Sequence, residues 1–323
     1  MKACHGHSSF VLLAACLLNL TVFAQTAPDN PVSRQAPMAE RYGKPYVMVT
    51  VNGKGPFRFI IDTGTGGDAF VTPQLALALG LPEIGHATLR DPSGQGGQKT
   101  PIVYIDSLEL AGVTFRAIPA LSYPFYAEAG TCDGLLGFTL FRDYLLTLDF
   151  PNRIVSLSSG ALKPDGGKEV LPFRMLDHIP VTTLKVDGLQ PVEAQIDSGG
   201  GGLVLPEKLA ARLKYEINPV VFASGRSVAT RFELKAGKLA SDVKLGRYTF
   251  MHPVVAIHPA FPLVNFGSPP MQIFAITFDQ KNLLVRFVAN QRKLSLNDFP
   301  SGPMRITNAP DNSPPPTGLV PVG

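Results

Sequence analysis

The sequence FIIDTGTGG, residues 59–67, returns in altered form as AQIDSGGGG, residues 194–202. In both stretches an apolar, strand-like run ends at an aspartate, and a hydroxyl residue and glycines follow. Glycine costs backbone entropy, so it is expected where the chain turns sharply or where another group comes close. No other Asp-Ser-Gly or Asp-Thr-Gly tripeptide occurs in the chain. These two loops decide the fold, and the question is what approaches their glycines.

The two loops belong to a longer internal repeat. YVMVTVNGKGPFRFIID, residues 46–62, aligns with VTTLKVDGLQPVEAQID, residues 181–197, at an offset of 135 residues. Farther along, GFTLFRDYLLTLDFPNRIVSL, residues 137–157, aligns with GSPPMQIFAITFDQKNLLVRF, residues 267–287, at an offset of 130. Each copy begins with a strand, an Asx-Gly turn and a second strand that ends at the aspartate. The chain is therefore predicted to contain two homologous lobes.

The composition agrees with a globular, mainly β protein. The chain has 323 residues, of which 45% are hydrophobic and 17% charged, which is enough for two cores. The 31 glycines and 30 prolines favour turns and strands over a helical bundle. One helix is expected after each glycine loop, where Pro73 and Pro206 precede leucine-alanine periodicity, and a second short helix after Gly137 and Gly267.

The predicted fold class is mainly β, with two pseudo-twofold-related, β-barrel-like lobes and a few short helices. The repeat and the composition divide the chain into a signal peptide (1–24), a short leader (25–43), an N-terminal lobe (44–157), a connector (158–176), a C-terminal lobe (177–289) and a Pro-rich disordered tail (290–323).

The N-terminus has the features of an export signal. Lys2 precedes a mostly apolar run at residues 10–24, which is short for a bilayer span and ends in Val-Phe-Ala, typical of signal-peptidase cleavage. This predicts a periplasmic or secreted protein with no stable membrane insertion. A lipid anchor on Cys16, which ends a lipobox-like Leu-Ala-Ala-Cys, and a retained anchor remain alternatives. Cleavage after Ala24 leaves Cys132 as the only thiol, which we expect to be a small buried residue without a disulfide.

Charge and motifs exclude several kinds of partner. The net charge is +4 and no dense basic block with interleaved aromatics occurs, so nucleic acid is not an expected partner. The glycines at 199–202 lack the lysine of a phosphate-binding loop. His252 and His258 flank a strand-like stretch and could form a metal pair, although surface or core roles are favoured. We therefore expect no cofactor and no metal.

The repeat gives the two aspartates a shared chemistry. A twofold axis between the lobes would bring Asp62 and Asp197 side by side. Two carboxylates about 3 Å apart, at an effective dielectric of about 20, repel by about 5 kcal/mol, or about four pK units. They would therefore share one proton, and one could act as base and the other as acid on a single water molecule. The glycines would let the two backbones and a substrate approach.

On these motifs the chain resembles the pepsin-like aspartic proteases, in the bilobal bacterial form whose lobes are near retropepsin size, over residues 45–289. The resemblance implies that Thr63 and Ser198 form hydrogen bonds across the two loops. It further implies that the loops supporting the aspartates include Gly64, Thr65 and Gly199, and that Gly137 and Gly267 end segments that thread past them. It implies a flap as well, for which residues 91–98 and Tyr104 are the candidates.

The resemblance predicts an exported aspartic endopeptidase that acts on polypeptides and is monomeric, with an internal pseudo-dimer. Two departures from the family pattern favour an alternative, an exported pseudo-protease that binds peptides without cutting them. Gly200 stands where the first loop has the hydroxyl of Thr65, and Asn265 replaces an apolar residue of the second threading segment. If the Thr65 hydroxyl donates a hydrogen bond to Asp62, Asp62 is the more acidic partner and Asp197 keeps the proton.

Overall fold

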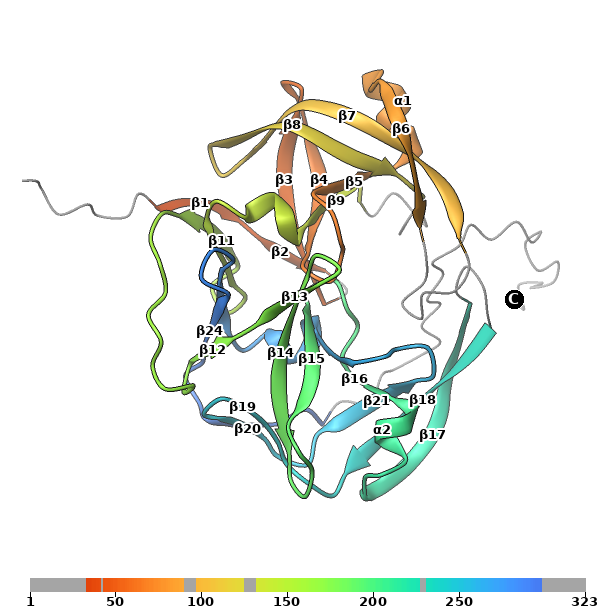
Figure 1. Cartoon of the computed structure of the whole chain (residues 1–323), viewed down its shortest axis with the longest axis vertical. Coiled ribbons are helices and arrows are strands. Elements are labelled where there is room, and N and C mark those ends of the chain that lie inside the picture. Colours follow the sequence, from red (N-terminus) through yellow and green to blue (C-terminus); the bar gives the residue numbers. More distant parts are fainter. Residues whose placement is uncertain (1–32, 42, 90–96, 125–131, 227–230, 298–323) are drawn as a thin grey trace, which may run out of the picture. The chain divides into compact units, whose positions relative to one another are not determined.

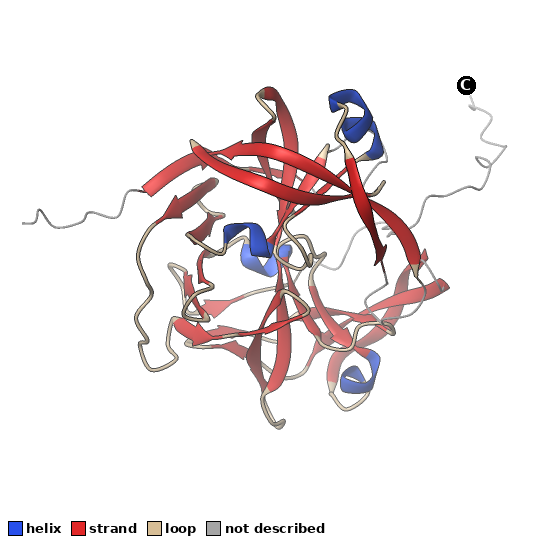
Figure 2. Ribbon diagram, turned by 45° about the horizontal axis from the view of Figure 1, so that its top comes forward, coloured by secondary structure: helices blue, strands red, loops and turns tan. Residues whose placement is uncertain are grey.

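A computed structural model describes residues 33–41, 43–89, 97–124, 132–226 and 231–297 (Figure 1). The predicted signal peptide, the tip of the candidate flap and the end of the tail lie outside the described residues. The described chain is mainly β with a few short helices, as predicted (Figure 2). None of its helices is long and apolar enough to cross a membrane.

The first lobe is built on an eight-stranded sheet, and two of its strands, β4 (Lys54–Asp62) and β9 (Gly134–Gly137), end beside the first aspartate loop. In spatial order the strands are β2 (Ala39–Arg41), β3 (Lys44–Val51), β4, β9, β5 (Ala69–Val71), β8 (Val113–Ser122), β7 (Gln98–Leu110) and β6 (Glu83–Leu89).

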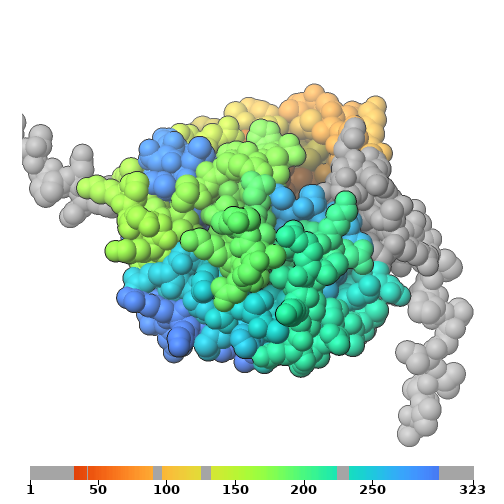
Figure 3. Space-filling view, turned by 60° about the horizontal axis from the view of Figure 1, so that its bottom comes forward, coloured from red at the N-terminus to blue at the C-terminus, as the bar shows by residue number. Residues whose placement is uncertain are grey.

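The second lobe repeats this arrangement. Its sheet follows the order β17 (Tyr215–Arg226), β18 (Arg231–Leu239), β21 (Val254–His258), β16 (Leu203–Pro206), β22 (Val264–Gly267), β15 (Val192–Asp197), β14 (Ile179–Val186), β19 (Val243–Leu245), β20 (Tyr248–Phe250) and β25 (Lys293–Leu294), with β13 (Arg174–Leu176) paired to β14. The order from β14 to β17 matches the order from β3 to β6, so the internal repeat of the sequence is a repeat of topology. Figure 3 shows the face formed largely by this lobe, in green to blue.

A third sheet joins the two lobes. Its order is β1 (Ser33–Pro37), β11 (Ile154–Ser158), β10 (Leu145–Asp149), β23 (Ala275–Asp279), β24 (Leu284–Val288) and β12 (Val170–Pro172). At its centre β10 and β23 are antiparallel, and Thr147 lies opposite Thr277 with their hydroxyl oxygens 2.9 Å apart. These two threonines are equivalent in the repeat, so the pseudo-twofold axis passes between them.

The four predicted helices are all present. They are α1 (Pro73–Leu79), the 3-10 helix η2 (Phe138–Phe141), α2 (Glu207–Ala210) and α3 (Ser268–Met271). The Thr72 hydroxyl caps α1 by accepting a hydrogen bond from the Leu75 amide at 3.2 Å, and Pro73 needs no partner for its first-turn nitrogen. Gly80, at φ 62°, ends the helix in the left-handed conformation that glycine adopts without strain.

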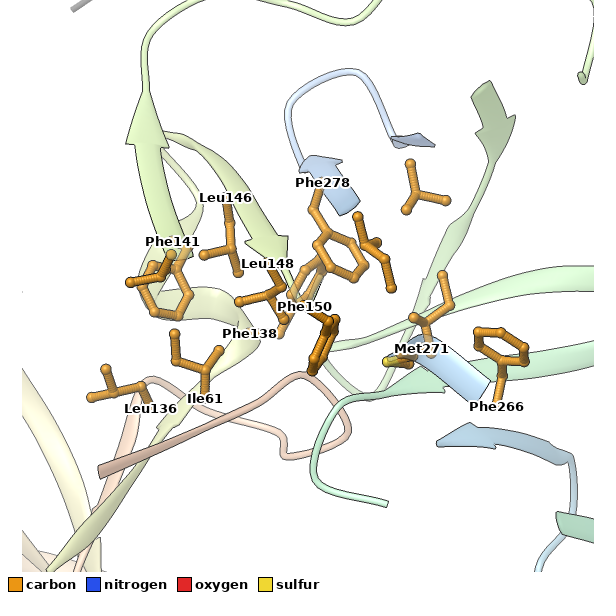
Figure 4. Close-up of a cluster of buried hydrophobic side chains, with 14 of the residues drawn as sticks. Ile61, Leu136, Phe138, Phe141, Leu146, Leu148, Phe150, Phe266, Met271 and Phe278 are labelled. Atoms are coloured by element: carbon orange, nitrogen blue, oxygen red, sulfur yellow. The ribbon is translucent and has the colours of Figure 1, made fainter. Parts of the chain in front are cut away.

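The core explains why these strands and short helices form. On β10 the side chains alternate, and Leu146 and Leu148 are fully buried while Thr147 faces the other side. Phe138 of η2 packs edge to face on Phe278 of β23, with ring centroids 5.2 Å apart. Figure 4 shows this cluster, in which side chains from both lobes and from the joining sheet meet. The two aspartate loops therefore stand on one continuous apolar base.

Parts of the predicted leader, connector and tail belong to the sheets. The leader contributes β1 and β2, and Met38 between them is buried. The connector contributes β12 and β13, and the first residues of the expected disordered tail contribute β25, whose Leu294 is buried. The reason is the same in each case, because these short segments pair with strand edges that would otherwise expose their backbone groups.

Candidate active site

The two aspartates occupy equivalent positions at the ends of two equivalent strands. Asp62 ends β4 and lies opposite Gly137 in the parallel pairing with β9. Asp197 ends β15 and lies opposite Gly267 in the parallel pairing with β22. Asp62 is buried with 6% of its surface exposed, and Asp197 is partly buried. The structure therefore brings together two carboxyl groups that are 135 positions apart in the sequence.

The glycines after the aspartates are required by the opposite lobe. A β-carbon at Gly64 would lie 2.3 Å from Cγ of Asp197, and one at Gly199 would lie 2.3 Å from Cγ of Asp62. No side chain fits at these distances. Each glycine also orients its own aspartate, because the Gly64 and Gly199 amides donate to Oδ1 of Asp62 and Asp197 respectively, both at 3.0 Å. What approaches the glycines is thus the carboxyl group of the other lobe.

Thr63 and Ser198 fasten the two loops to each other. The Thr63 amide donates to Oγ of Ser198 at 3.1 Å, and the Ser198 amide donates to Oγ1 of Thr63 at 3.0 Å. The Thr63 hydroxyl then donates to the carbonyl of Ile196 at 2.7 Å, and the Ser198 hydroxyl to the carbonyl of Ile61 at 2.6 Å. Both side chains are fully buried. The cross-loop hydrogen bonds expected from the resemblance are all formed.

The threading segments pass so close to the loops that only glycine fits there. A β-carbon at Gly137 would lie 2.1 Å from the carbonyl oxygen of Gly67, and one at Gly267 would lie 2.7 Å from the backbone of Gly202. The Gly267 amide donates to the Gly202 carbonyl at 2.8 Å. The two threading glycines thus let their segments pack directly against the backbones of the aspartate loops.

The structure corrects the expectation for Thr65. Its hydroxyl forms no hydrogen bond to Asp62 among the described residues, and its backbone amide instead turns back to the Asp62 carbonyl at 3.3 Å. The side-chain donor acts on the other aspartate. Asn265 Nδ2 donates to Oδ2 of Asp197 at 2.7 Å. Asn265, one of the two departures from the family pattern, is therefore in contact with Asp197.

Burial is the main cause that raises the pKa of Asp197, to about 7, and the negative charge of Asp62 raises it further. The hydrogen bond from Asn265 and the positive charge of Lys44 act in the opposite direction. Lys44 begins β3, and its ammonium group donates to the carbonyl of Gly199. Asp197 therefore keeps its proton to a higher pH than an ordinary aspartate does.

The two histidines singled out in the sequence have partners of their own. His252 pairs with Glu216 on the surface, and His258 is buried and stacked on Phe261, with ring centroids 4.4 Å apart. No cluster in the described part of the chain could hold a metal ion. Cys132 is buried, as predicted, and burial raises the pKa of its thiol to about 11. Tyr104 lies within β7 opposite Pro119. Because the tip of the candidate flap lies outside the described residues, its role as a flap contact stays a prediction.

Two residues of the site were not identified from the sequence. Lys44 is far from Gly199 and Asp197 in the chain, and no motif marks it. Asn265 was noticeable only as an exception to an apolar pattern. A polar residue inside an otherwise apolar strand, directly beside an aspartate loop, is the signal that could have identified it.

The comparison with protein families agrees with this geometry. The sequence model of the aspartyl protease family matches residues 47–140 and again residues 182–274. Each match covers most of one lobe and contains one aspartate loop. The chain therefore belongs to the aspartyl protease family and has its two-lobed organisation. A comparison with curated proteins gives no match.

Proposed function

We propose that the protein is an exported aspartic endopeptidase in which Asp62 and Asp197 activate one water molecule. The observation that carries the proposal is the reciprocal contact of each loop glycine with the opposite carboxyl group. This contact supports the proposal because two carboxyl groups so close together are expected to share a proton. A buried pair of this kind can supply a base and an acid to the same reaction.

The chemistry follows from that shared proton. The ionised carboxylate takes a proton from water as the water oxygen bonds to the carbonyl carbon of the peptide. The protonated carboxyl gives its proton to the carbonyl oxygen, which forms a tetrahedral diol. One hydroxyl of the diol then gives its proton to the carboxylate that is now ionised, and the other carboxyl gives its proton to the nitrogen. The carbon–nitrogen bond breaks, and the nitrogen leaves as an amine. The dyad ends with one proton, as it began.

The rival function is a pseudo-protease that binds peptides without cutting them. Gly200 and Asn265 are its support, because Gly200 lacks the hydroxyl that Thr65 has in the first loop and Asn265 replaces an apolar residue of the threading segment. The Asn265 hydrogen bond supplies a donor to that same aspartate, so the departures do not favour an inactive site. Export by the segment 1–24 remains part of the proposal, and N-terminal sequencing of the mature protein tests it against acylation at Cys16.

A direct test uses the exported protein with unfolded casein and a quenched-peptide library between pH 3 and pH 7. We expect cleavage that pepstatin inhibits and that Asp62→Asn and Asp197→Asn abolish. Peptides that bind to the wild type without being cut at any of these pH values would identify a pseudo-protease.

A further inference from the structure

We propose that Asn265 is a positioning residue of the dyad, which supplies from the threading strand the side-chain donor that the second aspartate loop lacks. Its catalytic meaning rests on the proposed function. The hydrogen bond itself, and its effect on the ionisation of Asp197, do not depend on what the site cleaves.

The geometry gives each oxygen of Asp197 its own donor. The Gly199 amide holds Oδ1 at 3.0 Å, and Asn265 Nδ2 holds Oδ2 at 2.7 Å. Asn265 is buried in β22, between Gln195 of β15 and Val204 of β16, so its backbone is fixed on both sides. A short hydrogen bond from a fixed amide restricts rotation of the carboxyl group.

The glycine at position 200 is the counterpart of this asparagine. A β-carbon at Gly200 would lie 2.9 Å from Nδ2 of Asn265 and 2.6 Å from Oδ2 of Asp197. The amide of Asn265 therefore occupies the space that a hydroxyl side chain at position 200 would need. In the first lobe the equivalent positions hold Thr65 and Leu135, so the two departures from the repeat form one coupled exchange.

Stability alone does not explain an asparagine at this position. Its second polar atom, Oδ1, is buried and has no hydrogen-bond partner in the described structure. An unpaired buried acceptor destabilises a fold, and such groups in native proteins call for a functional reason. Leucine, which the first lobe has at the equivalent position, would avoid the cost. What asparagine offers is the Nδ2 donor to Asp197.

The effect on titration does not require knowing which aspartate keeps the proton. The charged groups that act on Asp197 are Asp62 from β4 and Lys44 from β3. In the fully ionised pair, Asp197 carries its charge whichever carboxyl lost its proton first. A donor to that charge therefore lowers the sum of the two apparent pKa values of the pair, and its removal raises the sum.

The experiment compares wild type with Asn265→Leu and Asn265→Ala, which both lack the donor but differ in volume. The carboxyl carbons of aspartate are labelled with carbon-13 and titrated by NMR, with Asp62→Asn and Asp197→Asn to assign the signals. In parallel, kcat/KM is measured against pH on one peptide. Thr182→Val serves as control, because Thr182 is a buried residue of the same sheet whose hydroxyl donates to Pro172, away from the dyad.

We expect the sum of the two apparent pKa values to rise by about one unit in both Asn265 variants, and not in Thr182→Val. The limb of the kcat/KM profile that moves to higher pH identifies the affected ionisation. We also expect the Tm of Asn265→Leu to be no lower than that of Thr182→Val. The proposal would be overturned if the sum of the two apparent pKa values stayed at the wild-type value in every Asn265 variant that folds.

The two readouts separate this inference from the proposed function. The NMR titration needs no substrate. A raised sum in a protein that cuts no peptide would leave the positioning role intact and contradict the protease. Cleavage of peptides with an unchanged sum would contradict only the role of Asn265.

Discussion

The side chains of Thr63 and Ser198 join the two aspartate loops through four hydrogen bonds of 2.6–3.1 Å. Each hydroxyl accepts from one backbone amide and donates to one backbone carbonyl of the opposite loop and its strand. Because both residues are fully buried, water cannot replace a missing partner. The contact therefore contributes to stability and also fixes the distance between the two aspartates.

Thr63→Val and Ser198→Ala should each lower the free energy of unfolding by about 1–3 kcal/mol, because each strands a buried amide and a buried carbonyl. The cost of the double variant should differ from the sum by more than about 0.5 kcal/mol, because the two residues belong to one hydrogen-bond network between the loops. Urea unfolding measures both effects. Thr147→Val breaks a hydroxyl pair that does not touch the dyad and serves as control; fully additive losses would show that the two residues are not coupled.

Asp62→Asn and Asp197→Asn should each abolish turnover, and the double variant should be no worse, because the pair acts as a unit. The measurement is kcat/KM on one peptide. A single variant that keeps more than about a tenth of the wild-type rate would contradict the shared-proton mechanism.

The raised pKa of Asp197 also predicts a pH-dependent stability. Its folded pKa of about 7 lies above the unfolded value of about 3.9, so the folded state binds the proton more tightly. Wild type therefore has this contribution in full below about pH 4 and loses it as the pH rises towards 7. Asp197→Asn should melt at a higher temperature than wild type at pH 7, with the gain shrinking at pH 4. Calorimetry at the two pH values is the check, and a gain that is equal at both would contradict the assignment.

Gly64→Ala and Gly199→Ala should abolish activity, because each added methyl group would overlap the carboxyl group of the opposite aspartate. Gly53→Ala is the matched control. Gly53 has φ 71°, and no atom lies within 4 Å of an added β-carbon. An alanine there would therefore have a strained backbone without overlapping any neighbour. We expect Gly53→Ala to lose stability but keep its kcat. Activity in either loop variant would show that the lobes lie farther apart than in this structure.

Lys44→Met should raise the apparent pKa values of the dyad, because the positive charge of Lys44 lowers the pKa of Asp197. The profile of kcat/KM against pH should move to higher pH. The difference from wild type should narrow in 1 M salt, because salt screens the charge of Lys44 in the wild type. Lys54→Met, at the exposed start of β4, is the control and should leave the profile in place. Equal profiles for Lys44→Met and wild type at low salt would exclude this influence.

Thr65→Ala should leave both limbs of the pH profile where they are, since the Thr65 hydroxyl does not reach Asp62. A hydrogen bond from Thr65 to Asp62, which the sequence predicts, would instead make the acidic limb rise in this variant. The same kcat/KM series measures it, and a raised acidic limb would restore the original expectation.

The contrast between Thr65 and Asn265 indicates what the sequence could predict. The dyad and the four helices follow from local patterns that occur twice. The cross-loop hydroxyls and the threading glycines follow from the family resemblance that these patterns carry. Which donor reaches which carboxyl group depends on side-chain directions between strands that are not adjacent in the chain. Lys44 and Asn265 are far from their partners in sequence. The segments that form β1 and β12 become strands by pairing with the edge strands β11 and β24, and a local sequence pattern does not show that pairing.

The central pairing of β10 with β23 has a consequence for how such a site can change. The Thr147–Thr277 contact is what two identical chains would form across a true twofold axis. In an assembly of identical chains, every substitution appears on both sides, so an asparagine beside one aspartate would also stand beside the other. Joining the halves in one polypeptide removes that restriction. One half can then keep threonine and leucine while the other adopts glycine and asparagine, and two acids of identical type become chemically distinct.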